Sequence, residues 1–97
     1  MVTYIALCNF TDQGIRSVKD STKRADAVKT AAKKFGVSMT QIYWTLGNYD
    51  LVTVIEAPDD KSATAFALAV GAAGNVRTQT LRAFSKEEMD GILSKMA

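Results

Sequence analysis

Residues 39–57, MTQIYWTLGNYDLVTVIEA, decide the fold of this 97-residue chain. The runs 39–46 and 51–57 are rich in β-branched and aromatic residues, which is typical of strands. Between them lies GNYD at 47–50, whose glycine and asparagine tolerate the positive φ angles of a tight turn. The stretch therefore predicts a β-hairpin near the middle of the chain.

The pairing within this hairpin predicts two different sheet faces. If the chain turns over residues 48–49, Leu46 lies opposite Leu51 and Trp44 lies opposite Thr53. Successive side chains of a strand point to opposite faces, so this register makes one face apolar. The alternate face is mixed and carries Gln41, Tyr43, Thr45, Val52, Val54 and Glu56.

The segment before the hairpin predicts a strand and a long helix. Residues 2–9, VTYIALCN, have strand composition. Apolar residues then recur every three or four positions, which predicts a helix over 12–36. The DST cluster at 20–22 predicts a kink or break, because these short polar side chains compete for backbone hydrogen bonds. Gly36 ends the helix as a C-cap residue.

The segment after the hairpin predicts a helix, a strand and a second, shorter helix. Residues 58–60, PDD, open a helix that closes at the glycines of 71–74. Residues 75–84 alternate like a strand but are markedly polar. The SKEE stretch at 85–88 predicts a capping box. One face of the helix that follows carries Met89, Ile92, Leu93 and Met96, and we expect it to pack on a neighbouring surface.

These elements predict an α+β, ferredoxin-like fold in a single domain of residues 1–97. The order β-α-β-β-α-β with right-handed crossovers predicts an antiparallel sheet of order 4-1-3-2, with both long helices on one face. The other face would expose Tyr43, Val52 and Val54 on a monomer. A second copy packing sheet on sheet would bury them. We therefore expect a homodimer, arranged as a dimeric α/β barrel, or a larger homo-oligomer.

The composition excludes several classes of protein. Cys8 is the only cysteine and histidine is absent, so the chain has neither an intramolecular disulfide nor the usual soft metal ligands. We expect no metal or other cofactor, and the missing histidine argues against a haem-degrading enzyme. A free cysteine fits a reducing cytoplasm. The apolar run 63–70 is too short to cross a membrane, and the first residues do not resemble a secretion signal.

Basic residues are concentrated in one segment. Residues 11–36 hold seven lysines and arginines but three aspartates. No aromatic residue interleaves with these charges to stack on bases, so we expect a solvated helix face rather than a nucleic-acid site. An effector or nucleic-acid-linked role of this helix is kept as a third alternative.

The motif Gly47-Asn48-Tyr49-Asp50 resembles the Gly-x-Tyr-Asp motif of the GYD-domain family, a largely uncharacterised bacterial group. The resemblance covers practically the whole chain. It extends to Tyr4-Ile5, to TDQGIR at 11–16, to EAPDD at 56–60, to GNVRT at 74–78 and to LRAF at 81–84. It implies the dimeric α/β-barrel fold and brings no established activity.

Three residues are candidates for catalysis. Glu56 ends an otherwise apolar strand and points the same way as Tyr43, so it could act as a general acid or base. Its structural alternative is a strand-end ion pair with Arg77 or Arg82, or a helix cap. Tyr49 and Asp50 could deliver a phenol and a carboxylate to the mouth of a cavity. Alternatively, they stabilise the turn and cover the end of the barrel.

A second group of residues predicts a binding site for a small polar or anionic ligand. Guanidinium and hydroxyl donors suit a carboxylate or a phosphate. The polar strand supplies such donors, with Thr78, Thr80 and Arg82 on one face and Arg77 on the other. Together with Tyr4, Tyr43 and Glu56 they would line the barrel interior. The alternative is that they hydrogen-bond to Glu56 or Asp50 of a second subunit.

The leading functional hypothesis is a homo-oligomeric small-molecule-binding or accessory protein with this ligand in the barrel interior. The alternative is a cofactor-independent enzyme, an oxygenase, isomerase or lyase, that acts on a small carbonyl or phenolic substrate. In that case Glu56 or Asp50 would be the base, and Tyr49 or Arg82 would support the electrophile.

Overall fold

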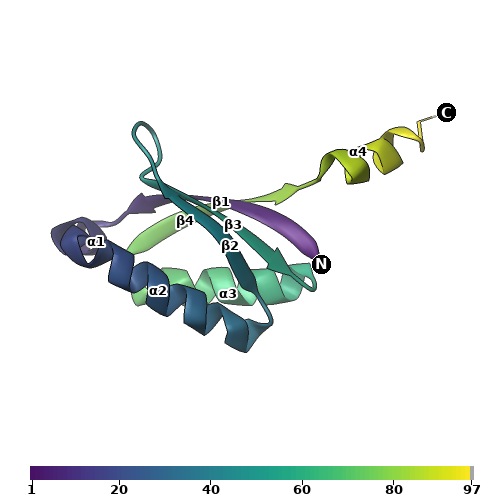
Figure 1. Ribbon diagram of the computed structural model, residues 1–97. Coiled ribbons are helices and arrows are strands. Elements are labelled where there is room, and N and C mark those ends of the chain that lie inside the picture. Colours follow the sequence, from purple (N-terminus) through teal and green to yellow (C-terminus); the bar gives the residue numbers. More distant parts are fainter. Residues whose placement is uncertain (97) are drawn as a thin grey trace.

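Four strands form one antiparallel sheet in the computed structural model, which describes residues 1–96 (Figure 1). They are β1 (Val2–Phe10), β2 (Ser38–Trp44), β3 (Leu51–Ala57) and β4 (Val76–Ala83). Their order is β2-β3-β1-β4, and each neighbouring pair is antiparallel. The predicted order of 4-1-3-2 is therefore confirmed.

Two long helices lie against one face of this sheet, α2 (Ser21–Ala32) and α3 (Asp60–Ala73) (Figure 1). The helix predicted over 12–36 is broken into α1 (Asp12–Arg16), the 3-10 turn η1 (Val18–Asp20), α2 and the 3-10 turn η2 (Lys33–Phe35). The break comes at Ser17, whose φ of −111° and ψ of 30° are not helical, so it lies just before the predicted cluster. No helix within residues 1–96 is long and apolar enough to cross a membrane.

The two long helical segments end on glycines in the left-handed conformation. Gly36 has a φ of 72° and Gly74 a φ of 88°. A residue with a Cβ atom is strained at such angles, whereas glycine adopts them freely. The predicted C-cap at Gly36 is thus confirmed, and Gly74 rather than Gly71 ends the second helix.

The hairpin register differs from the prediction. Trp44 pairs with Leu51, and the backbone N–H of Thr45 donates to the Asp50 carbonyl at 2.8 Å. The turn is therefore centred on Gly47 and Asn48, one residue earlier than predicted. The strand partners shift by two residues, so each side chain keeps its predicted face. A β-bulge between Met39 and Gln41 is a further irregularity that the pattern did not indicate.

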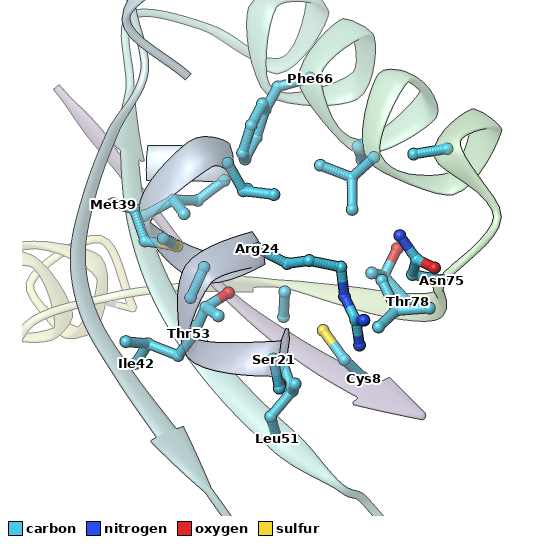
Figure 2. Close-up of a pocket in the computed structure, with 18 of the residues that line it drawn as sticks. Cys8, Ser21, Arg24, Met39, Ile42, Leu51, Thr53, Phe66, Asn75 and Thr78 are labelled. Atoms are coloured by element: carbon cyan, nitrogen blue, oxygen red, sulfur yellow. The ribbon is translucent and has the colours of Figure 1, made fainter. Parts of the chain in front are cut away.

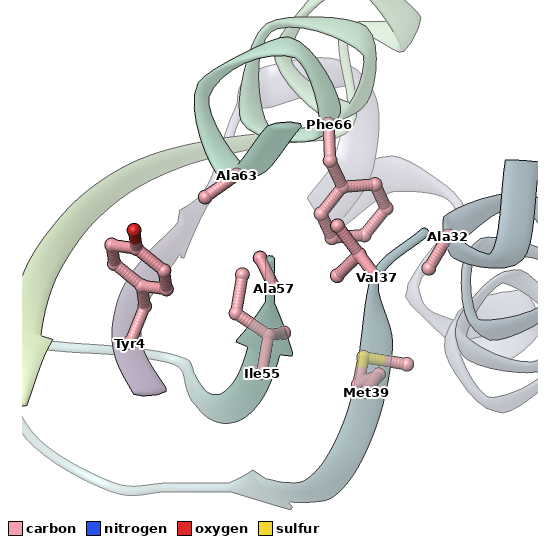
Figure 3. Packing of buried hydrophobic residues seen from close by; sticks show 8 residues of the cluster. All are labelled: Tyr4, Ala32, Val37, Met39, Ile55, Ala57, Ala63 and Phe66. Carbon is pink, nitrogen blue, oxygen red and sulfur yellow. The ribbon is translucent and has the colours of Figure 1, made fainter. Parts of the chain in front are cut away.

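The core fills the space between the sheet and the two long helices (Figure 3). Phe66 of α3 packs there with Val37, Ile55 and Ala57, and its ring centroid lies 6.0 Å from that of Phe35. Period-two burial along β3, with Leu51, Thr53, Ile55 and Ala57 buried, shows which side of the strand meets the helices.

The other sheet face, here called the open face, has no helix over it (Figure 1). Its apolar members are Ile5, Leu7, Tyr43, Val52, Val54 and Leu81. On the two edge strands of this face, Tyr43 is 58% exposed and Leu81 is 41% exposed. The predicted uncovered face is therefore present.

The C-terminal helix α4 (Lys86–Leu93) projects away from the sheet and the other helices (Figure 1). The predicted capping box is confirmed, because Ser85 Oγ accepts from the Glu88 N–H and the Glu88 carboxylate accepts from the Ser85 N–H. Met89, Ile92 and Leu93 are exposed. The projecting helix raises the radius of gyration to 14.6 Å, whereas a compact domain of this length has roughly 12.5 Å.

Candidate functional site

The two sheet faces divide the residues predicted to line one interior. Tyr4, Thr78, Thr80 and Arg82 lie on the helix-covered face, because Tyr4 is buried in the core and pairs with Arg82 in the sheet. Tyr43, Glu56 and Arg77 lie on the open face, as their partners Val52, Thr3 and Asn9 do. The predicted separation of Arg77 from the other three β4 residues is confirmed. The prediction that all these side chains line one interior is wrong, because Tyr4 and Tyr43 point to opposite faces of the sheet.

The helix-side residues line a groove between α3 and β4, here called the α3–β4 groove. The Tyr4 hydroxyl donates to Asp60 Oδ1 in the first turn of α3. This bond to a carboxylate raises the pKa of Tyr4 above its usual value. The pattern predicted Asp60 only as a helix-opening acid, since nothing local signals a partner 56 residues away.

Arg77, although on the open face by sheet register, also lines the α3–β4 groove. Arg82 is the cation that the helix-covered face supplies to this groove. Its guanidinium carbon lies 4.4 Å from the Phe84 ring centroid and 5.9 Å from that of Tyr4, so it stacks on aromatic faces. It donates to the Ala83 carbonyl and has no carboxylate partner within residues 1–96. Thr78 and Thr80 beside it make no side-chain hydrogen bond in the same part of the chain. These free donors can hydrogen-bond to an anionic group.

The hairpin of β2 and β3 with the connecting motif Gly47-Asn48-Tyr49-Asp50, here called the GYD hairpin, stabilises the end of the sheet. The Asp50 carboxylate accepts from the Phe10 N–H at 2.8 Å, and the Asp50 N–H donates to the Cys8 carbonyl at 2.8 Å. Tyr49 donates its hydroxyl to Gln79 Oε1 of β4 at 3.0 Å. Gly47 has a φ of 113°, which explains the glycine at this turn. Both side chains thus hold the hairpin against β1 and β4.

The three candidate catalytic residues do not converge within one chain. Tyr49 and Asp50 precede β3, whereas Glu56 lies near its other end, about 20 Å further along an extended strand. Glu56 also forms no ion pair with Arg77 or Arg82, since the one ion pair within residues 1–96 joins Lys86 to Asp90. Their catalytic roles therefore stay predictions that would need a second subunit.

Cys8 offers no reactive thiol. Its side chain is buried on the helix-covered face, and desolvation raises its pKa to about 11. The thiolate fraction at neutral pH is therefore very small. Within residues 1–96 no group of three or more potential metal-ligating side chains comes together.

Comparisons with known proteins agree with this architecture. A model of the GYD domain matches residues 4–93. A Thermus thermophilus protein described as "Glutamine synthetase and cystathionine beta-lyase binding protein" is 34% identical over 84 residues, which is 86% of this chain and 88% of the relative. The crystal structure of TTHA0845 from the same organism superposes on this chain with a TM-score of 0.57 at 23% sequence identity. The superposition covers 88% of this chain and 95% of TTHA0845. Its small α+β fold is thus shared, and the chain belongs to the GYD domain family.

Proposed function

We propose that the chain is a single-domain, homo-oligomeric accessory protein of the cytoplasm that binds other proteins. The observation that carries the proposal is the large solvent-accessible surface of the chain. The chain exposes 6671 Å² at a mass of 10.5 kDa, whereas a folded monomer of that mass exposes roughly 5,400 Å². The excess of roughly 1,200 Å² exceeds the roughly 800 Å² that each partner buries in a standard interface.

A second copy accounts for this excess. Packing open face on open face as a dimeric α/β barrel buries the six apolar side chains of that face, and α4 lies over the neighbouring subunit. Glu56 and Arg77 lie at opposite ends of the open face, because they flank residues 3 and 9 of β1. A two-fold axis can therefore bring Glu56 of each copy to Arg77 of the other. This pairing supplies the cation that Glu56 lacks within its own chain.

The partner is inferred from the relative that is 34% identical, whose printed name gives glutamine synthetase and cystathionine β-lyase as the proteins it binds. Accessory binding of an enzyme also fits a chain whose candidate catalytic residues are about 20 Å apart within one subunit. We therefore infer that this chain binds a glutamine synthetase or a cystathionine β-lyase.

The test measures molar mass by light scattering and binding to each purified enzyme by sedimentation. Wild type should run as a dimer or larger and co-sediment with one of the enzymes. Val54→Arg, in the middle of the open face, should be monomeric and bind at least tenfold more weakly. Ala27→Arg adds the same charge on the exposed side of α2 and should change neither result.

Two results would contradict the proposal separately. A wild-type chain that stays monomeric at all concentrations removes the homo-oligomer. A dimeric chain that sediments with neither enzyme removes the partner. If monomeric Val54→Arg binds as tightly as wild type, self-association is not required for binding.

A small anionic ligand in the α3–β4 groove is the second candidate. The observation that favours it is the unpaired Arg82 guanidinium beside the free hydroxyls of Thr78 and Thr80. Inorganic phosphate should raise the melting temperature of wild type but not of Arg82→Gln, whereas Arg16→Gln should keep the effect. An equal shift in all three proteins would contradict this candidate.

A further inference from the structure

A second cavity, of about 120 Å³ and partly open to solvent, lies between α2, α3 and the helix-covered face of the sheet (Figure 2). Small side chains create it. Its floor includes Ala6 and Cys8 of β1, and its roof includes Ala25 of α2 and Ala67 of α3. Larger residues at these four positions would fill the space.

One side of this cavity is polar and carries a cation. Figure 2 shows the Arg24 side chain extending from α2 toward Cys8, Thr78 and Asn75. Nη1 of Arg24 donates to the Ser17 carbonyl at 2.8 Å and to Ser17 Oγ at 2.7 Å, and Nη2 donates to the Gly14 carbonyl at 3.2 Å. These bonds hold the guanidinium in place at the cavity.

Arg24 has only neutral hydrogen-bond acceptors. It is half-buried, and no carboxylate in residues 1–96 lies within ion-pair distance of it. A partly desolvated cation is stabilised by a counter-charge, so an anionic group that enters the cavity finds a complementary charge there.

Two hydroxyls of the cavity lining have spare donor capacity. Thr53 is buried on the cavity floor and makes no side-chain hydrogen bond to any residue of 1–96. Ser21 Oγ accepts from Trp44 Nε1 at 2.8 Å and donates to no other described residue. The cavity therefore combines an apolar wall with a cation and free hydroxyl donors.

We propose that this cavity binds a small monocarboxylate with a branched aliphatic body. The carboxylate pairs with Arg24, and the body lies over Ala6 and Cys8. A dry cavity of about 150 Å³ accommodates benzene, so this one takes a body of about four to five carbon atoms. A phosphate is excluded, because the apolar wall would leave several of its oxygens without donors. The site is distinct from the open face, and it borders the α3–β4 groove, with which it shares Ala67, Val76, Thr78 and Thr80.

Trp44 reports directly on this proposal. It is the only tryptophan of the chain and it lines the cavity. Titration of the full chain with isovalerate should change its fluorescence with saturation. Isovaleramide has the same shape without the charge, so it should bind about tenfold more weakly or worse. Equal binding of acid and amide, or no saturable change with the acid, overturns the proposal.

Three variants assign the site. Ala6→Val fills the floor and should weaken isovalerate binding at least tenfold while Arg24 stays in place. Arg24→Gln should weaken it to the level of the amide, whereas Arg16→Gln removes an equal charge on exposed α1 and should bind like wild type.

Arg24→Gln also removes the bonds to Ser17 and Gly14, so its melting curve is measured first. If it does not fold, the amide and Ala6→Val decide the question on their own. Undiminished binding by Ala6→Val overturns the proposal in either case.

Discussion

At the scale of single residues, Gly14 has no room for a side chain. A Cβ atom at this buried position would lie 1.9 Å from the Asn75 carbonyl oxygen, in a backbone that also accepts the Thr11 N–H at 3.1 Å. Gly14→Ala should therefore destabilise the fold by about 1–3 kcal/mol. Urea unfolding followed by circular dichroism measures this change.

The matched control is Gly71→Ala within α3, where nothing lies within 4 Å of the added Cβ. It should stabilise the protein by about 0.5–1 kcal/mol, because alanine loses less backbone entropy than glycine in a helix. If Gly14→Ala were equally harmless, the close approach of α1 to Asn75 would be wrong.

The hydrogen bond of Tyr4 predicts that the stability of the fold depends on pH in the alkaline range. Its hydrogen bond to the Asp60 carboxylate raises its pKa above 10.0, so the folded state holds this proton more tightly than the unfolded state. The resulting stabilisation is fully present below about pH 10 and is lost as the pH rises through the raised pKa. Wild type should therefore lose stability relative to Tyr4→Phe in that range, as measured by denaturant unfolding at a series of pH values.

The sign has an independent check. Asp60→Asn removes both the charged acceptor and its repulsion of a tyrosinate, so it should lower the pKa of Tyr4. The difference in tyrosinate absorbance between each protein and its Tyr4→Phe counterpart measures this pKa. A higher pKa in Asp60→Asn would contradict the assigned cause.

At the scale of elements, the Asp50 side chain joins the GYD hairpin to β1. Asp50 receives the Phe10 N–H at the end of β1. Asp50→Ala removes this charged acceptor and leaves the N–H unpaired, so it should cost about 1.5–3 kcal/mol. Thermal and urea unfolding measure the loss.

Asn48→Ala is the control, because Asn48 is exposed in the same turn and makes no side-chain hydrogen bond within the described chain. Its effect should be clearly smaller than that of Asp50→Ala. If Asp50→Ala keeps full stability but abolishes an enzymatic activity, the catalytic hypothesis for Asp50 gains over the structural role.

At the scale of the whole molecule, we expect α4 to contribute to association of the subunits and not to folding of its own domain. Figure 1 shows it projecting away from the sheet and from the other helices of residues 1–96, and its apolar side chains are exposed. Ending the chain at Phe84 should therefore leave the unfolding transition of the domain intact while the dimer dissociates at a higher concentration. Circular dichroism and concentration-dependent light scattering separate the two effects. A truncated chain that no longer folds would show that α4 stabilises its own subunit instead.

The sequence alone determined the kinds of elements, their order and the faces of the strands. Period-two alternation in residues 51–57, the glycine ends of the helices and the SKEE capping box are local features, and each acts within a few residues of the chain. The strand order followed from the handedness of the crossovers. The predicted register was wrong by two residues, but each hairpin residue still lies on its predicted sheet face. The reason is that side chains of a strand alternate between the faces with a period of two residues.

Only the tertiary structure decided which side chains meet. The hairpin turns one residue earlier than predicted and closes where Asp50 binds Phe10, a contact across 40 residues. Tyr4 meets Asp60 across 56 residues, and it lies on the face opposite Tyr43 and Glu56. Arg24, in a segment predicted to form a solvated face, lines a cavity between the helices and the sheet. Local patterns cannot specify such contacts, because they depend on how distant strands and helices pack against one another.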